Sequence, residues 1–505
     1  MTSRRRFYVT TAIPYVNGDP HLGHALEFVQ ADVLARHRRA RGDAVRFLSG
    51  TDDHALKNVD AAAAAGVPVA RFVAQKADRF VALGALLELS NDDFIRTSTD
   101  PRHEAGVRRL WARCEEAGDL YQRDYEGLYC GGCEAFLAPE DLEDGCCGEH
   151  RVAPEAIAER NWFFRLSRHE DALLALIEGG ELRIEPEQRR NEVVAFINGG
   201  LHDFSVSRTR RRARGWGIPV PGDPEQVVYV WFDALANYIT ALGYGCDGEA
   251  YGHWWRNGHE RAHVIGKGIV RFHAVYWPAI LLSAGEPLPT SIFVHDYLTA
   301  EGRKISKSTG AVVDPVDLID RYTPDALRWW LTRDVPPNGD ADFRERLLAA
   351  RANELADGLG NLVSRTIGLA ARHRTVVAGE AGGLPDALRE LAGRCARLPA
   401  VIDGALSAFD LRAATTALWD VVCEANRCVS STQPWRLAAA ARAGDRDASD
   451  RLGVILAALL DPAGVIAREL AAFLPAAAGR ISRAIADADP AQARTLFAKF
   501  EQPVD

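Results

Sequence analysis

Residues 7–24 read FYVTTAIPYVNGDPHLGH, and this stretch decides the fold. Its first part, 7–13, is apolar and β-prone and is followed by turn residues, so we expect a strand there. A helix is expected over 23–41, because apolar side chains recur there at near-helical spacing. A second short strand is expected over 44–48, with the polar run SGTDDH at 49–54 directly after it. Strand, loop, helix and strand predict a parallel nucleotide-binding sheet, whose ligands bind beyond the carboxyl ends of the strands.

The rest of the chain predicts the completion of this sheet and then a set of helices. A cysteine-rich stretch at 129–150 interrupts the α/β pattern, and strands are expected again at 227–232, 263–265 and 291–294. From about residue 343 onward, Ala- and Leu-rich amphipathic stretches predict a helical bundle.

Length, composition and charge limit the class of protein. A chain of 505 residues with 47% hydrophobic residues is expected to form two or three packed units. No stretch approaches the ~20 apolar residues of a membrane span, so a cytoplasmic enzyme without membrane contact is expected. The net charge of -9 argues against a protein that coats nucleic acid non-specifically. This net charge is compatible with a protein that binds a folded RNA through local positive patches, such as the arginines at 36–41 and 208–214.

Two short motifs carry the candidate chemistry. His21 and His24 flank Gly23 at a predicted helix start, where imidazoles, free backbone N–H groups and the positive helix end suit the phosphates of a nucleotide. By itself this pattern fits a helix-capping role equally well. Residues 302–310 read GRKISKSTG, which places Lys304 and Lys307 in a loop that can bring two ammonium groups to a triphosphate. By itself this loop is equally well interpreted as solvated surface.

Together the two motifs resemble the HIGH and KMSKS signatures of class I aminoacyl-tRNA synthetases, and the stretches around them are similar to the methionine-specific enzymes. The resemblance runs from residue 7 to about residue 435. The matching stretches are AIPY at 12–15, GTD at 50–52, NWFF at 161–164, WGIPVPGD at 216–223, VWFDAL at 230–235, HVIGK at 263–267, RFH at 271–273, YWP at 276–278 and VDP at 313–315.

The resemblance implies a fold and a division of the chain. The fold is an α/β Rossmann-type nucleotide-binding catalytic domain with an inserted zinc-knuckle connective domain, followed by an α-helical anticodon-binding bundle. The implied segments are the first half of the catalytic domain at 1–114, the connective domain at 115–225, the second catalytic half at 226–290, a lysine-loop region contacting the tRNA stem at 291–345 and the anticodon-binding domain at 346–505.

The resemblance also implies ATP-dependent activation of methionine and its transfer to initiator and elongator tRNA(Met). The implied amino-acid pocket consists of Ile13, Tyr15, Asp52, Trp231, Ala234, Leu235, Tyr238, Phe272 and His273. Aromatic walls from Tyr15, Trp231 and Phe272 suit a polarizable thioether, and Asp52 can pair with the ammonium group. The alternative interpretation is that such aromatic residues belong to the hydrophobic core.

Neither step of the implied reaction needs a nucleophile from the protein. The methionine carboxylate attacks the α-phosphate of Mg-ATP, and a ribose hydroxyl of tRNA then takes the acyl group, so catalysis is positioning and charge stabilisation. The expected catalytic residues are His21, His24, Lys304 and Lys307. The expected ATP-binding residues are His21, His24, Gly266, Lys267, Lys304, Lys307 and Ser308.

The cysteine-rich stretch predicts a structural zinc site. Cys130 and Cys133 form a Cys-x2-Cys pair, and Cys147 and His150 follow in a Cys-x2-His pair, which suits tetrahedral Zn²⁺. Cys146 is the competing third ligand. Four protein ligands leave no open position, so we expect no catalytic metal here. In the family, this knuckle lies over the acceptor end of tRNA, and the arginines at 208–214 are hypothesised to contact the same strand, which salt-dependent tRNA binding by Arg-to-Ala variants would test.

In the helical part, Asn361, Arg365 and Trp435 match the family's anticodon-reading positions. An exposed indole can stack on a base, and amide and guanidinium groups can hydrogen-bond its edge. A buried Trp435 is the alternative. No further tRNA-binding domain follows the helices, so a monomer is expected.

Several positions depart from the family pattern. These positions are Asp53, Ala55, Leu56, Gly268, Asp296, Ala311 and Asp357. Ile305 replaces a usual methionine in the lysine loop, and Met1 is the only methionine of the chain. One interpretation of this composition is a back-up or inhibitor-resistant enzyme that is made when methionyl-tRNA is scarce, and the other, slightly favoured, is compositional drift in an Ala- and Arg-rich proteome. A paralogue that serves a biosynthetic pathway is a further alternative. A small adenylyltransferase carrying only the histidine motif is disfavoured by the lysine loop.

Overall fold

The computed structural model describes residues 4–130, 135–137, 142–148, 151–300, 302–305, 313–373 and 384–501. The chain forms two compact units. The first unit contains residues 1–20, 41–85 and 90–295, and the second contains residues 21–40, 86–89 and 296–505.

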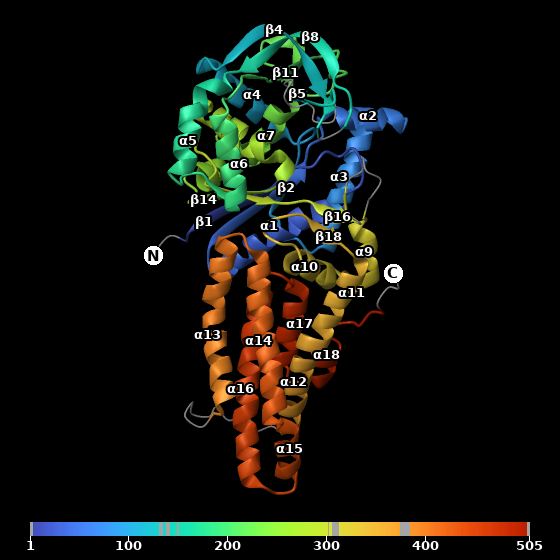
Figure 1. The fold of residues 1–505 in the computed structure, drawn as a ribbon, viewed down its shortest axis with the longest axis vertical. Helices are drawn as coiled ribbons and strands as arrows, with labels where there is room; N and C mark the ends of the chain where they lie inside the picture. Colours follow the sequence, from blue (N-terminus) through green and yellow to red (C-terminus); the bar gives the residue numbers. More distant parts are fainter. Residues whose placement is uncertain are drawn as a thin grey trace. The chain divides into compact units, whose positions relative to one another are not determined.

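A six-stranded parallel sheet is the centre of the first unit (Figure 1), which confirms the predicted α/β fold. Its strand order is β3-β2-β1-β14-β15-β9, and every neighbouring pair is parallel. The strands are β1 (Arg6–Thr11), β2 (Ala44–Thr51), β3 (Asp93–Arg96), β9 (Arg183–Glu185), β14 (Glu260–Gly266) and β15 (Ser291–His295). Long β-branched and aromatic runs suit strands that are covered on both faces.

The strand order reverses between β1 and β14. From β1 the chain proceeds outward to β2 and β3, whereas β14 is followed by β15 on the other side. In such sheets, ligands bind where the order reverses, outside the carboxyl ends of the strands. The segments that leave these ends contain Tyr15 after β1, Asp52 after β2 and Lys267 after β14.

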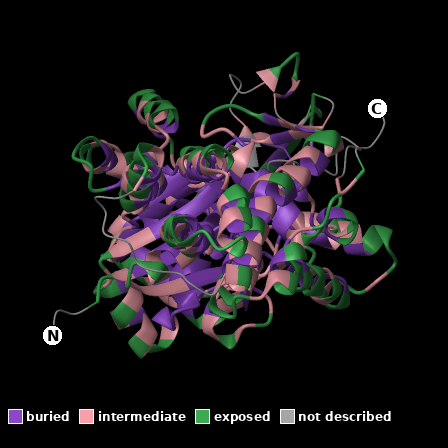
Figure 2. Cartoon of the chain, turned by 90° about the horizontal axis from the view of Figure 1, so that it is seen from below, coloured by how far each residue is buried: buried purple, intermediate pink, exposed green. Residues whose placement is uncertain are grey.

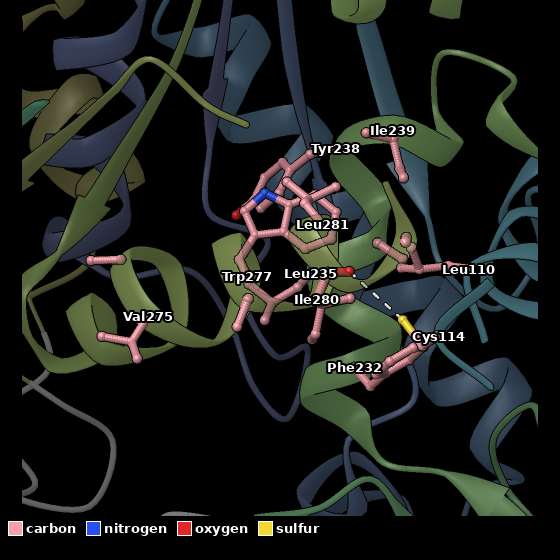
Figure 3. Packing of buried hydrophobic residues seen from close by; sticks show 14 of the residues in the cluster. Leu110, Cys114, Phe232, Leu235, Tyr238, Ile239, Val275, Trp277, Ile280 and Leu281 are labelled. Atoms are coloured by element: carbon pink, nitrogen blue, oxygen red, sulfur yellow. Dashed lines mark hydrogen bonds between the residues drawn. The ribbon is translucent and has the colours of Figure 1, made fainter. Parts of the chain in front are cut away.

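Helices packed on this sheet carry its hydrophobic core. The helices α4 (Pro101–Glu116), α7 (Val230–Thr240) and α8 (Trp277–Ala284) contribute Leu110, Leu235 and Trp277 to one buried cluster, which Figure 3 shows from close by. In it, the Cys114 thiol donates to the Ile280 carbonyl oxygen at 3.7 Å. Burial raises the pKa of that thiol to about 12, so Cys114 is an inert core residue.

One predicted strand is wrong in its second half. The strand expected over 227–232 is β13 (Asp223–Val228), but it ends at Val228, and helix α7 begins at Val230. All but one of the residues of α7 are buried, so its apolar run fits a buried helix as well as a strand, and periodicity does not separate the two. Four expected pocket residues therefore lie on a helix, namely Trp231, Ala234, Leu235 and Tyr238.

Smaller antiparallel sheets interrupt the parallel fold. One has the order β10-β8-β4-β5, with β4 (Leu120–Cys130), β5 (Ala135–Leu137), β8 (Glu155–Phe164) and β10 (Phe204–Ser205). The others join β11 (Ser207–Thr209), β13 and β12 (Pro219–Val220), and β6 (Leu142–Glu143) with β7 (Cys146–Cys147). The remaining α-helices that begin in this unit are α2 (Leu56–Ala64), α3 (Val69–Leu86), α5 (Glu170–Glu178) and α6 (Glu187–Asn198).

The second unit is mainly helical, as predicted from residue 343 onward (Figure 1). It begins with α1 (Leu22–Ala40) and has a small sheet of β17 (Arg303–Lys304), β16 (Leu298–Ala300) and β18 (Ala341–Phe343). Its other helices are α9 (Pro315–Tyr322), α10 (Pro324–Arg333), α11 (Glu345–Glu354), α12 (Asn361–His373), α13 (Asp386–Ser407), α14 (Leu411–Thr432), α15 (Pro434–Arg442), α16 (Arg446–Leu470), α17 (Pro475–Ala486) and α18 (Pro490–Arg494).

Strands differ from helices and loops in how far their residues are buried. In Figure 2 the strands are coloured mostly as buried, and exposed residues gather on helices and loops. Within the part of the chain that the structure describes, no helix combines the length and the apolar character that crossing a membrane requires.

Candidate active site

The carboxyl edge of the parallel sheet brings together the first expected pocket residues. Tyr15 and Asp52 form a parallel bridge, and the Asp52 backbone N–H donates to the Pro14 carbonyl oxygen at 2.9 Å. A Cβ on Gly50 would lie 2.4 Å from the Ile95 carbonyl oxygen and 3.0 Å from Ile13, so this approach requires glycine. The Asp52 side chain is buried, and its Oδ1 accepts from the His54 backbone N–H at 3.0 Å.

Three aromatic rings of the expected pocket lie together as a group. Trp231 stacks on Phe272 with ring centroids 3.7 Å apart and planes 5° from parallel. Tyr15 lies 6.3 Å from Trp231 at a tilted angle. Phe272 therefore covers one face of Trp231. Stacking restrains the orientation of the indole.

Tyr238 and His273 are the polar members of the expected pocket. The Tyr238 hydroxyl lies 2.7 Å from His273 Nε2, and His273 Nδ1 lies 3.0 Å from the Ile269 carbonyl oxygen. Burial lowers the pKa of His273 to about 4, so the ring is neutral at physiological pH. A carbonyl oxygen only accepts, so the ring proton is on Nδ1 and the tyrosine donates to Nε2. The pair thus has one defined hydrogen-bond direction.

The expected nucleotide-binding residues Gly266 and Lys267 follow the strand next to β1. Gly266 ends β14, and Lys267 begins the 3-10 helix η5 (Lys267–Ile269). Gly268, where the family usually has an acidic residue, is the middle residue of that turn.

In the second unit, the two motif histidines adopt one defined tautomer. His21 Nδ1 accepts from the Gly23 backbone N–H at 3.2 Å, and His24 Nδ1 accepts from the His21 backbone N–H at 3.0 Å. The rings stack with centroids 3.8 Å apart. Each ring therefore carries its proton on Nε2, the atom that can donate to a phosphate oxygen. The expectation of free N–H groups at the helix start is wrong here, because these groups already have acceptors in the chain.

The chain that follows the lysine-loop segment reaches the same helix start. The Leu22 backbone N–H donates to the Val313 carbonyl oxygen at 3.1 Å, so the chain after the loop lies against the first residue of α1. Lys304 ends β17 and pairs with Thr299 of β16, whereas Lys307 and Ser308 lie outside the described residues. Ile305, where the family often has methionine, is buried, and its N–H donates to the Leu298 carbonyl oxygen at 2.9 Å.

Two of the four expected zinc ligands are described. Cys130 ends β4 and Cys147 ends β7, and both side chains are buried and free of disulfides. Cys133 and His150 lie outside the described residues. Cys146, the competing ligand, is only half-buried. Among the residues that the structure describes, no group of three metal-binding side chains is found.

The expected anticodon residues lie in the helical bundle. Asn361 and Arg365 are one turn apart on α12, so they share a face of that helix. The Trp435 side chain, in the first turn of α15, is 45% exposed, which rejects the alternative that it is a core residue. Helices α12 and α15 pack through a buried cluster that includes Ala370 and Ala438.

The arginine cluster at 208–214 is less available than the sequence implied. Arg208 is buried, and its guanidinium lies 4.1 Å from the centre of the Tyr229 ring. Arg212 stacks in the same way on Tyr129 at 4.1 Å. Arg210 and Arg211 are exposed and remain candidates for contact with RNA.

Two departures from the family pattern have clear partners in the structure. Asp53 is buried, and its Oδ2 accepts from the Ser98 hydroxyl at 2.6 Å, while burial raises the pKa of this carboxyl. Asp357 pairs with Lys499 at 2.5 Å. Neither departure removes a predicted site residue.

Sequence reasoning missed a buried network around Asp233. Its two carboxylate oxygens lie 2.6 Å from His54 Nδ1 and 2.5 Å from His103 Nε2. These partners are 179 and 130 residues away along the chain, so no local pattern could indicate the contact.

Known proteins are similar to this chain over most of its length. Residues 7–153 and 133–367 match the family model described as tRNA synthetases class I (M). A methionine–tRNA ligase of Brucella suis is 41% identical over 444 residues, covering 86% of this chain and 84% of that protein. One of Mycobacterium leprae is 41% identical over 445 residues, covering 86% and 81%.

A solved structure is similar to this chain as well. The Mycobacterium tuberculosis methionyl-tRNA synthetase in complex with methionyl-adenylate superimposes with a TM-score of 0.89 at 39% identity, covering 95% of this chain and 93% of that one. Identity of this extent, over nearly the full length of both chains, is sufficient to assign the family. The chain therefore belongs to the class I tRNA synthetases specific for methionine, the methionine–tRNA ligases.

Proposed function

We propose that this chain uses Mg-ATP to activate methionine and then transfers the methionyl group to initiator and elongator tRNA(Met). The observation that carries the proposal is the buried Asp52, which is bridged to Tyr15 at the carboxyl edge of the sheet, together with the Trp231 ring that lies near Tyr15 and stacks on Phe272. A carboxylate next to aromatic surface fits an amino acid whose ammonium group is charged and whose side chain is a polarizable thioether.

The proposed pocket contacts both the ammonium group and the side chain of methionine. Asp52 pairs with the ammonium group, Trp231 and Tyr15 contact the side chain, and Phe272 keeps the indole in place. Ile13, Ala234 and Leu235 complete the apolar surface. Tyr238 and His273 form the polar part of the pocket, and the hydrogen bond between them holds both side chains in place. Such positioning brings the methionine carboxylate to the α-phosphate of ATP.

The first step forms a bond between a methionine carboxylate oxygen and the α-phosphorus, and the bond to pyrophosphate breaks. His21 and His24 donate from Nε2 to phosphate oxygens, and Lys304 and Lys307 neutralise the charge that develops on the leaving pyrophosphate. Gly266, Lys267 and Ser308 bind the nucleotide. In the second step, a terminal ribose hydroxyl of tRNA attacks the acyl carbon, and AMP leaves with the bond electrons.

Charging assays test this proposal directly. We expect the purified chain to attach methionine to transcripts of both initiator and elongator tRNA(Met), with release of AMP and pyrophosphate. Formation of methionyl-adenylate without charging of either tRNA would contradict the transfer step and would favour a biosynthetic role for the adenylate.

We also propose that Cys130, Cys133, Cys147 and His150 hold a structural Zn²⁺. The two described thiols are buried and reduced, which suits thiolate ligands that no solvent reaches. The metal would tie two short hairpins together. Cys147, which is buried, suits the third position better than the half-buried Cys146.

Metal analysis tests the zinc proposal. The purified chain is expected to contain about one zinc ion, and Cys147→Ser should lose most of it, because a tetrahedral site needs all four ligands. The matched control is Cys246→Ser, since Cys246 is an exposed thiol away from the cysteine-rich stretch. Equal zinc content in both variants would remove the assignment.

We propose that Asn361, Arg365 and Trp435 read the anticodon. The Trp435→Ala variant is expected to lower kcat/KM for tRNA about 10-fold, the scale of losing one base–aromatic stack. The methionine-dependent exchange of pyrophosphate into ATP should stay unchanged, because it does not involve the bundle. Val401→Ala, which truncates another exposed apolar residue of the bundle, is the control. An equal effect of both variants on charging would contradict the role of the indole.

The resemblance to the family implies a different function for each segment of the chain. We propose that 1–114 and 226–290 form the catalytic domain, 115–225 the connective domain, 291–345 the stem-contact region and 346–505 the anticodon-binding domain. We further propose that the enzyme works in the cytoplasm as a monomer, which a molar mass of 55.2 kDa in light scattering would support and a doubled mass would contradict.

A further inference from the structure

Asp233 lies at the centre of a buried network in the first unit. Its Oδ2 is 2.6 Å from His54 Nδ1, and its Oδ1 is 2.5 Å from His103 Nε2. The Asp233 and His103 side chains are almost fully buried, and that of His54 is 10% exposed. Both carboxylate oxygens are therefore occupied by imidazoles and are not available to a substrate.

The network joins two of the segments that carry the proposed methionine pocket. Asp233 is in the first turn of α7, between Trp231 and Ala234, and His54 is two residues after Asp52 in the loop that follows β2. His103, near the start of α4, holds α7 a second time, because its Nδ1 lies 2.8 Å from the Thr240 hydroxyl.

The contact continues from His54 to the Asp52 carboxylate. The His54 backbone N–H donates to Asp52 Oδ1 at 3.0 Å, so the position of His54 determines where that oxygen lies. The Trp216 indole supports this loop, since its Nε1 donates to the Asp53 carbonyl oxygen at 2.8 Å and its ring meets the His54 ring edge-on.

The charges in the network favour an ionised Asp233. Burial by itself would raise the pKa of Asp233, but His54 and His103 outweigh it and hold the pKa well below its usual range. Burial opposes charge on His54 as well, yet Asp233, with smaller contributions from Asp53 and Glu104, raises the pKa of this imidazole. Loss of the Asp233 charge would remove the main attraction that holds His54.

We propose that Asp233 is a positioning residue for methionine: through His54 it fixes the Asp52 carboxylate where the substrate ammonium group binds. The inference rests on the proposed role of Asp52. It predicts that the network acts on amino-acid recognition and leaves the ATP side of the reaction unaffected. Asp233 does not touch methionine and takes no part in bond formation.

Two conservative variants of the full-length enzyme test this inference. D233N keeps the shape and removes the charge, and H54Q keeps the backbone amide and removes the imidazole. Each is expected to raise the methionine KM in pyrophosphate exchange about 10-fold, the scale of losing a hydrogen bond to a charged group. The ATP KM and kcat should change less than about 2-fold, because ground-state binding of one substrate is affected.

A deaminated analogue makes the test specific to the ammonium group. 4-(Methylthio)butanoate has the side chain and carboxylate of methionine but no amine, so its inhibition constant should be the same for wild type, D233N and H54Q. An equal loss of affinity for methionine and for this analogue would contradict the inference, because it would indicate general damage to the pocket.

The control is D119N, which changes another buried carboxylate with a histidine partner. Asp119 contacts Arg168 and His169 of the 3-10 helix η2 (Leu166–His169). D119N is expected to lower the melting temperature without changing the methionine KM. If D233N does not fold, H54Q alone decides, and an unchanged methionine KM in that variant would overturn the inference.

The D52N variant separates this inference from the proposed pocket. If D52N leaves the methionine KM unchanged, the proposed pocket itself is wrong. If D52N raises it and H54Q does not, only the positioning role of Asp233 and His54 is wrong. If the inference is correct, D52N and the double variant D52N/H54Q should have the same methionine KM, because His54 acts through Asp52.

Discussion

Replacing His24 with asparagine is expected to slow methionine-dependent pyrophosphate exchange about 100-fold, the scale of losing one donor to a developing negative charge. His24 Nδ1 accepts from the His21 backbone N–H at 3.0 Å, so the ring proton is on Nε2. An asparagine oxygen can take the place of Nδ1 and preserve the helix start. It offers no donor at the position of Nε2, so the loss should appear in kcat.

The matched variant is His24→Gln, whose longer amide can place an N–H group near the position of Nε2. Glutamine should therefore retain more activity than asparagine, while both variants bind methionine normally in equilibrium measurements. If asparagine proved as active as wild type, or more active than glutamine, the assignment of Nε2 as the phosphate donor would be wrong.

Replacing Arg328 with methionine is expected to lower the free energy of unfolding of the second unit by about 3 kcal/mol, the lower end of the cost of removing one partner of a buried ion pair, because Asp32 keeps Arg36 as a second partner. The Arg328 side chain is fully buried, and its Nη2 lies 2.7 Å from Asp32 Oδ2 on α1. The same guanidinium donates to the carbonyl oxygens of Leu87 at 2.8 Å and Phe473 at 2.7 Å. One side chain thus ties α1 to α10 and to the end of α16.

Urea unfolding followed by tryptophan fluorescence measures this effect. The control is Arg321→Met, which removes a partly exposed ion pair with Glu345 on the same unit and should cost less than about 1 kcal/mol. Equal midpoints for the two variants would show that the buried pair does not stabilise α1. A rescue is also expected, since Asp32→Leu combined with Arg328→Met removes both charges and should recover part of the loss.

Local patterns were sufficient for most of the fold. The strand expected over 44–48 is β2 (Ala44–Thr51), and the helix expected over 23–41 is α1 (Leu22–Ala40). In these elements, apolar residues recur at one clear spacing, or turn residues mark the ends. The same holds for the helical bundle, whose apolar residues recur at helical spacing. Period alone failed at 230–232, because an apolar run that is buried on all sides has no polar face to reveal a helix.

The chemistry of the site was only partly visible in the sequence. The resemblance placed Trp231 and Phe272 in one pocket, but their stacking depends on the packing of elements 41 positions apart. The burial of Arg208 against Tyr229 has the same origin. Asp233 lies inside the matching stretch VWFDAL, yet its histidine partners come from two other parts of the chain. Long-range contacts of this kind follow from topology, which composition and spacing do not determine.

The central claim is that the aromatic and carboxylate pocket selects methionine for activation by ATP. Pyrophosphate exchange measured with each of the twenty standard amino acids tests it most directly. Methionine alone should support rapid exchange, and the D52N variant should need far more of it. Exchange that prefers another amino acid, or none with methionine, would contradict the account.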